Sequence, residues 1–404
     1  MIKKLLKNEF VKGSLFLFIG ANFLNFFNFL FHFIVGRMIG VADYSVVAAI
    51  VSMAYIFSIP TEAIQTIISK YTVKFSKSEK KINNLLVKSL KKFFFISLVC
   101  FIIFISFSTI LGSLMHISYR IIIFSGLMIF GIFLMPIGRG VLQGKKRFRR
   151  LGLSFFIEGF IKVFGAVALI MLGLRVYGAI GGIILSLTLS LLLVIYFIKD
   201  YLKIKSKREG IKGIYSYSYP TLISLGAIIL FYSLDVLLAK IFFSPVIAGQ
   251  YAIISLFGKS VFFASSPISK AMFPLMSETK DKKKRADLIK KSIIMILGIA
   301  LIGILFFGLL GGIIIRFMGS DFSGLEKFIW LPAIAMTFLA LTNLFVYYNL
   351  AVDKLKRNLY LIGLIILEVT LLYFFRSSVI NFMIALIVSN AITFIFYLFA
   401  YLRK

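Results

Sequence analysis

The sequence predicts an all-α polytopic membrane protein with twelve transmembrane helices and with both termini in the cytoplasm. Three observations predict this class: hydrophobic residues make up 60% of the 404 residues, apolar segments recur along the whole chain, and basic residues gather in every second loop. A membrane-spanning helix needs about 20 mostly apolar residues. The twelve segments that meet this length are residues 13–36, 44–69, 93–115, 120–143, 151–173, 177–198, 214–239, 247–275, 292–315, 328–350, 358–375 and 379–401.

The basic residues orient these segments. About five times as many of the 46 Lys and Arg residues fall on the side that holds the two termini as on the other side, which is the positive-inside pattern. Anionic lipids of the inner leaflet therefore account for the net charge of +31, and no nucleic-acid partner is expected. Residues 1–12 lead into the first segment without a small-residue cleavage site, which predicts an uncleaved first span. The expected location is the cytoplasmic membrane.

The two halves of the chain resemble each other. The longest charged connection near the middle, residues 199–212, separates six segments from six. Tyr44 precedes Pro60 in the second segment, and Tyr251 precedes Pro267 at the same spacing in the eighth. An internal duplication of six segments gives two lobes of the same orientation, with a binding site expected between them. The predicted lobes are residues 1–206 and 207–404.

The sequence offers no support for an enzyme. It has no Ser-His-Asp, paired-carboxylate or Cys/His constellation, and a single cysteine, Cys100, gives neither a disulfide framework nor a metal cluster. A GxxxxGK[ST] motif and a soluble motor domain are both missing from the sequence. We therefore expect a transporter without cofactors, driven by a proton or sodium gradient or by the gradient of its own substrate.

Basic residues inside the apolar segments are the first candidates for a binding site. A charge at membrane depth is costly, so it usually faces a bundle interior or a water-filled cavity. Lys259 and Lys270 are eleven residues apart, which places them on one helix face about 16 Å from each other. Such a ladder of cations would suit an anionic ligand, although long side chains can instead reach back to the headgroups. The candidate cations are Arg37, Arg139, Lys162, Lys259 and Lys270.

Four acidic residues also lie within the apolar segments: Glu62, Glu158, Asp235 and Glu368. The spacing of Glu158 and Lys162 favours a local ion pair on one helix; alternatively, Lys162 contributes to a cationic cavity and Glu158 modulates its charge. The acids are candidates for coupling transport to protons or sodium ions, or for pairing with the lysines across the cleft. The sequence leaves both interpretations open.

Several short motifs along the chain resemble one family. In the second half these are DVLLAKIFFSPVIAGQY from Asp235 and FPLMSE from Phe273; in the first half they are GRMIGVADY from Gly36 and RGVLQGKKRF from Arg139. They resemble the Wzx-like polysaccharide flippases of the multidrug/oligosaccharidyl-lipid/polysaccharide (MOP) exporter superfamily. The resemblance covers nearly the whole chain in order.

The resemblance implies a V-shaped pair of six-helix lobes that works by alternating access. Such proteins move a polyprenyl-diphosphate-linked oligosaccharide to the outer leaflet, and their cationic cavities hold the diphosphate and sugar acids. The five cations named above would be the diphosphate contacts in this chain, with Lys259 the first choice. The substrate and the membrane lipids are the expected partners, with a polysaccharide polymerase or glycosyltransferases as further candidates.

A cation-coupled multidrug exporter of the same superfamily is the alternative. A site for organic cations should be rich in acids and aromatics, whereas the deep charges here include both bases and acids. In the duplication, Ser52 and Ala63 stand in the first half where Lys259 and Lys270 stand in the second. The sequence therefore predicts that the cations concentrate in the C-terminal lobe.

Overall fold

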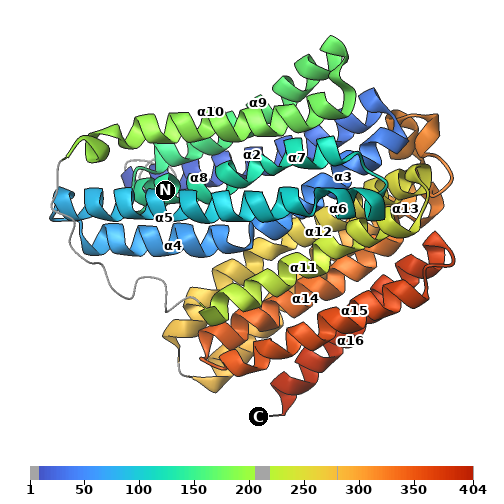
Figure 1. Cartoon of the computed structure of the whole chain (residues 1–404). Helices are drawn as coiled ribbons and strands as arrows, with labels where there is room; N and C mark the ends of the chain where they lie inside the picture. The colour runs from blue at the N-terminus through green and yellow to red at the C-terminus, as the bar shows by residue number, and fades with distance from the viewer. Residues whose placement is uncertain (1–8, 205–218, 280, 404) are drawn as a thin grey trace. The chain divides into compact units, whose positions relative to one another are not determined.

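Helices make up the regular structure throughout the part of the chain that the computed structural model describes, which is residues 9–204, 219–279 and 281–403 (Figure 1). The longer helices are α2 (Glu9–Ile39), α3 (Val41–Phe57), α4 (Ile59–Lys74), α5 (Glu79–Ser106), α8 (Met128–Gly144), α9 (Phe148–Leu169), α10 (Arg175–Lys203), α11 (Tyr219–Phe242), α12 (Pro245–Glu278), α13 (Lys282–Met318), α14 (Trp330–Ala351), α15 (Tyr360–Phe374) and α16 (Val379–Leu402). The shorter elements are α6 (Ser108–Met115), α7 (Tyr119–Gly126), η1 (Ile170–Leu174), η3 (Ser320–Phe322), η4 (Glu326–Phe328) and η5 (Leu355–Leu359). The predicted all-α class is confirmed.

These helices account for the predicted membrane spans. Within the described residues, 10 helical stretches are long and apolar enough to cross a membrane. One of them, Phe148–Lys203, has 56 residues, far more than the roughly 20 that one crossing needs. Its backbone reverses at Gly173 and Arg175, whose φ angles are +86° and +40°, so that α9 and α10 pack against each other. With α2 included, each of the twelve predicted segments lies mostly in helix over its described residues, with breaks at residues such as Ser58, Phe107 and Leu127.

The helices group into two compact units. Unit 1 comprises the described residues of Met1–Ile39 and Phe57–Ser218, and unit 2 those of Gly40–Ile56 and Tyr219–Lys404. The predicted boundary between residues 206 and 207 lies outside the described residues, so the division into two six-helix lobes stays a prediction. The cytoplasmic placement of both termini likewise stays a prediction.

The second predicted span is interrupted. Helix α3 ends at Phe57, and α4 begins at Ile59 with Pro60 in its first turn, where the missing proline N–H removes no helical hydrogen bond. Helix α3 packs within unit 2, because a Cβ atom on Gly249 of α12 would lie only 2.0 Å from the carbonyl oxygen of Val41. The backbones of α3 and α12 are therefore in direct contact, which only glycine allows at this point.

Glycines also set the helix packing inside each unit. In unit 1, a Cβ atom on Gly140 or Gly144 of α8 would lie 2.8 or 2.6 Å from carbonyl oxygens of α4. Close approach through small residues four apart is typical of helix pairs in membranes. In unit 2, Gly258 of α12 packs in the same way on Pro332 of α14. This packing holds the charged side chains of α8 and α12 at fixed positions between helices.

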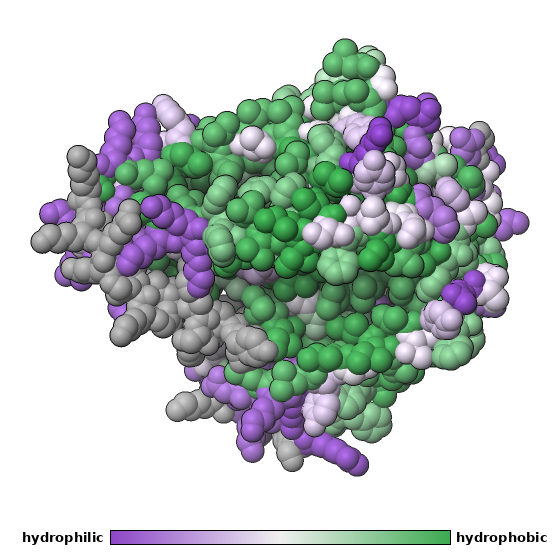
Figure 2. All heavy atoms as spheres, in the orientation of Figure 1, coloured by the Kyte–Doolittle hydropathy of each residue, from purple (hydrophilic) through white to green (hydrophobic). Residues whose placement is uncertain are grey.

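The outer surface suits a lipid environment. Apolar side chains cover the helices along their middle, and hydrophilic side chains gather towards the helix ends (Figure 2). On α13, Ile302 and Leu309 are 70% and 79% exposed. Large contiguous apolar surfaces are rare on soluble monomers, whereas a helix with its backbone groups satisfied internally can present them to hydrocarbon.

Candidate functional site

Two clusters of charged side chains lie inside the membrane-spanning helices, one in each unit. The unit 1 charge cluster consists of Arg139 on α8 with Glu158 and Lys162 on α9. The unit 2 charge cluster consists of Asp235 on α11, Lys259 on α12 and Glu368 on α15. Together they contain six of the nine charged residues that the sequence singles out. The other three, Arg37, Glu62 and Lys270, are exposed on α2, α4 and α12 and belong to neither cluster.

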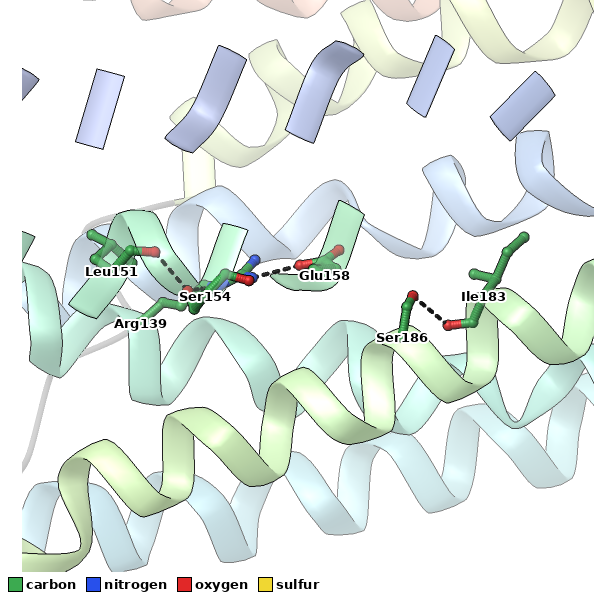
Figure 3. Close-up of polar contacts among 6 residues, drawn as sticks. All are labelled: Arg139, Leu151, Ser154, Glu158, Ile183 and Ser186. Carbon is green, nitrogen blue, oxygen red and sulfur yellow. Dashed lines mark hydrogen bonds and ion pairs between the residues drawn. The ribbon is translucent and has the colours of Figure 1, made fainter. Parts of the chain in front are cut away.

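Arg139 anchors the unit 1 charge cluster. Its Nε donates to Ser154 Oγ and its Nη2 to the Ser154 carbonyl oxygen, both at 3.2 Å, and Nη2 also forms an ion pair with Glu158 Oε2 at 2.5 Å. Figure 3 shows the guanidinium group lying along α9 between these two residues. The ring of Phe155 lies below the guanidinium carbon, 4.2 Å from it. Arg139 is buried, and every one of these partners comes from one turn of α9.

Lys162 lies one turn further along α9 and has neutral neighbours. Its Nζ donates to Asn28 Oδ1 at 3.0 Å and lies 4.7 Å from the centre of the Phe31 ring, both on α2. Among the described residues, no carboxylate is within ion-pairing distance of this ammonium group. Lys162 is only half-buried, and its charge is thus held in place without being cancelled.

The spacing of Glu158 and Lys162 predicts a local ion pair on α9. In the structure, Glu158 instead pairs with Arg139 of α8. A planar guanidinium group binds a carboxylate and neighbouring oxygens at once, which an ammonium group cannot match. Helices α8 and α9 pack against each other, which brings the two side chains within reach. Glu158 therefore pairs with Arg139 alone, and the cluster has one positive charge in excess.

The unit 2 charge cluster is closed and fully buried. Asp235 is 0% exposed and accepts three hydrogen bonds from α12. Tyr251 Oη and Ser255 Oγ donate to its Oδ2 at 3.0 and 2.5 Å, and Lys259 Nζ forms an ion pair with its Oδ1 at 2.9 Å. The three donors are spaced four residues apart, so they line one face of α12. Removing one partner of such a buried pair typically costs about 3–5 kcal/mol.

Glu368 completes this cluster from α15. It is also 0% exposed, and the charges of Asp235 and Lys259 both act on it. Ser389 Oγ and Asn390 Nδ2, on α16, reach its Oε2 at 3.4 Å. With two acids and one base, the unit 2 charge cluster has the opposite balance to the unit 1 charge cluster.

The structure therefore assigns neighbours that the sequence interpretation lacked. Lys259, the first choice for a diphosphate contact, is 6% exposed and is neutralised by Asp235. The missed residues are neutral: Asn28 and Ser154 in unit 1, and Tyr251, Ser255 and Asn390 in unit 2. The spacing of Tyr251, Ser255 and Lys259 along one helix face is a signal that could have found the unit 2 partners. Nothing comparable links Asn28 to Lys162, which are far apart in the sequence.

The sequence also matches the profile of a known family. The match covers residues 10–280, and the family is described as "Polysaccharide biosynthesis protein". The chain belongs to this family. Among individual relatives, an uncharacterised membrane protein of Methanocaldococcus jannaschii is 24% identical, with 94% of this chain and 91% of that protein covered.

Solved structures show the same fold at low sequence identity. An inward-facing multidrug resistance MATE family transporter of the MOP superfamily superposes with a TM-score of 0.76 and 15% identity, covering 94% of each chain. The lipid II flippase MurJ in an inward closed conformation gives a TM-score of 0.73 at 14% identity, covering 94% of this chain and 87% of MurJ. A MOP superfamily transporter from Pyrococcus furiosus gives 0.60 at 15% identity, covering 98% and 95%. The chain thus has the MATE-like fold of MOP transporters.

These comparisons confirm several predictions made from the sequence. The chain is a multi-pass membrane protein with a MATE-like fold, and its family is linked to polysaccharide biosynthesis.

Proposed function

We propose that the chain moves a polyprenyl-diphosphate-linked oligosaccharide across the cytoplasmic membrane by alternating access. The family description and the fold shared with a lipid II flippase support a lipid-linked substrate. A diphosphate with several sugars does not cross hydrocarbon unaided, because its polar groups would lose their hydrogen bonds to water. A transporter must replace that water with fixed cations and donors while the prenyl chain remains in lipid.

The uncancelled charge of Lys162 is the observation that carries this proposal. Its ammonium group is half-buried and oriented by Asn28 and Phe31. A diphosphate would therefore give it an anionic partner within ion-pairing distance, which Glu158 does not. Arg139, on the contacting helix α8, adds a planar guanidinium group suited to phosphate oxygens. The unit 1 charge cluster thus offers one net positive charge on rigid helices. Lys259, Lys270 and Arg37 remain candidate contacts on the sequence argument alone.

Reconstitution into liposomes tests the proposed function. Purified full-length protein is placed in vesicles that contain a polyprenyl-diphosphate oligosaccharide in both leaflets, and a membrane-impermeant reagent modifies the sugars it can reach. Vesicles with protein should convert nearly all of the lipid, and protein-free vesicles about half of it. Conversion that stops at half in both preparations would contradict the proposed function.

A cation-coupled multidrug exporter is the second candidate. Two acids against one lysine in the unit 2 charge cluster favour it, since a site for organic cations needs negative charge, and the MATE family transporter has the same fold. Uptake of a cationic dye by the same vesicles, with no movement of the lipid-linked oligosaccharide, would support this second function.

A further inference from the structure

The unit 2 charge cluster contains two acceptor atoms that no donor serves. Glu368 Oε1 and Asn390 Oδ1 are both completely buried and have no hydrogen-bond partner within the part of the chain that the structure describes. The two side chains already contact each other through Asn390 Nδ2 and Glu368 Oε2, 3.4 Å apart. Buried polar atoms are nearly always hydrogen-bonded, so acceptors without a donor on two contacting side chains indicate an additional hydrogen atom, water molecule or cation.

The balance of charge in the cluster leads to the same conclusion. Within the described residues, Lys259 is the cation that acts on Glu368, and its ammonium group is already bound to Asp235 Oδ1. An ionised Glu368 would leave one negative charge uncompensated at 0% exposure. A buried carboxylate without a counter-charge is strongly unfavourable and takes up a proton instead.

Among the described residues, Lys259 is the one base whose charge acts on Glu368, and the buried Lys240 of α11 donates to Ser45 instead. Helix α15 packs against α11, α16 and η5. From α11 it meets Asp235, and Lys259 and Tyr251 reach it from α12, whereas α16 contributes the neutral Ser389 and Asn390. The basic residues of η5 precede α15, more than two helical turns from Glu368.

A metal cation fits the cluster less well than a proton. Hard cations are held by several oxygen ligands at once. Both oxygens of Asp235 are already occupied, Oδ1 by the Lys259 ammonium group and Oδ2 by two hydroxyl groups. Lys259 therefore occupies the oxygen of Asp235 that a metal cation would need. The oxygens that remain for a metal are those of Glu368 and Asn390, which are fewer than a hard cation requires.

We propose that Glu368 binds one exchangeable proton on its Oε1 atom, and that this proton, not an alkali cation, is the ion coupled to transport. The coupling role rests on the proposed transport function, whereas the occupancy of the site does not. Protonation makes Glu368 neutral and supplies the missing donor beside Asn390. The cluster then holds one ion pair, Asp235 with Lys259, and no uncompensated charge.

Infrared spectroscopy of the purified full-length protein, without substrate, tests the occupancy. A protonated carboxylic acid has a carbonyl stretching band distinct from that of a carboxylate. Wild-type protein at neutral pH should show this band, and Glu368→Gln should lose it, since glutamine has the shape of the protonated acid and preserves the fold. Glu158→Gln, at an acid that is ion-paired, should keep the band. A wild-type spectrum without the band, or a band unchanged in Glu368→Gln, would overturn the proposal.

A comparison of choline chloride with sodium chloride distinguishes a bound proton from a bound alkali cation. The thermal unfolding temperature of the wild-type protein should be the same in both salts. Sodium-specific stabilisation that disappears in Glu368→Gln would show a metal at this site and overturn the proposal. In vesicles that move substrate, an imposed proton gradient should change the initial rate several-fold for wild type and leave Glu368→Gln unaffected. A wild type that moves no substrate contradicts the proposed function and leaves the infrared result standing.

Discussion

The two charge clusters are built from the same kinds of residue and end with opposite balances. Unit 1 has two cations and one acid, which pairs with Arg139 alone, and the cluster is partly open, with the Glu158 side chain 16% exposed. In unit 2, two acids share one cation, and both acids are completely buried. An open cluster with surplus positive charge can receive an anionic group, whereas a closed one must balance its charge internally. We therefore propose that substrate binds in unit 1 and that ion coupling takes place in unit 2.

The largest expected effect is on the stability of unit 2. Asp235→Asn leaves the Lys259 ammonium group buried without a counter-charge and should lower the free energy of unfolding by about 3–5 kcal/mol. Thermal unfolding in detergent measures this loss. The double variant Asp235→Asn with Lys259→Met removes both charges and should recover most of the stability. A double variant no more stable than Asp235→Asn would show that the two residues do not act as a pair.

Substrate binding should depend most on Lys162. Lys162→Met removes a charge-assisted contact worth about 1.5–3 kcal/mol, so affinity for polyprenyl diphosphate should fall about ten-fold or more. Unfolding should change less, because its hydrogen-bond partner, Asn28, is neutral and only half-buried. Lys291→Met is the matched control, at an exposed lysine that pairs with Asp287. Equal affinities for the two variants would show that Lys162 does not contact the diphosphate.

A smaller change of the opposite sign is expected at Glu158. Glu158→Gln retains an acceptor for Arg139 but raises the net charge of the unit 1 charge cluster by one unit. Affinity for polyprenyl diphosphate should rise by about 1 kcal/mol, or about five-fold, and binding to a neutral prenyl alcohol should stay unchanged. Weaker diphosphate binding would mean that Glu158 acts by positioning Arg139 and not through its charge.

The smallest effect is expected at Lys270, which is exposed on α12. Lys270→Met should change the unfolding free energy by less than about 0.5 kcal/mol, as is usual for a surface position. Transport of the lipid-linked substrate should also stay within about two-fold, which is roughly the same energy. A ten-fold loss of transport would restore the sequence interpretation in which Lys259 and Lys270 form a cationic ladder.

The helices and the charged residues inside them could be predicted from the sequence. The helices follow from the length of the apolar segments, and the charged residues stand out because a charge in hydrocarbon is costly. It could not assign partners. Asp235 and Lys259 meet only because α11 and α12 fold back on each other, and Glu158 chooses Arg139 over Lys162 through a helix contact that no local spacing encodes. The prediction that cations concentrate in the C-terminal half stays a prediction, and it did not include the neutralisation of Lys259 by Asp235.

The rate at which vesicles move the lipid-linked oligosaccharide, compared between Lys162→Met and Lys291→Met, is the most direct test of this account. We predict a wild-type rate for Lys291→Met. For Lys162→Met we predict a rate that is lower by about ten-fold or more, as expected for the loss of one charge-assisted phosphate contact. Equal rates for the two variants, in vesicles where the wild type is active, would contradict a diphosphate site built on the surplus charge of unit 1.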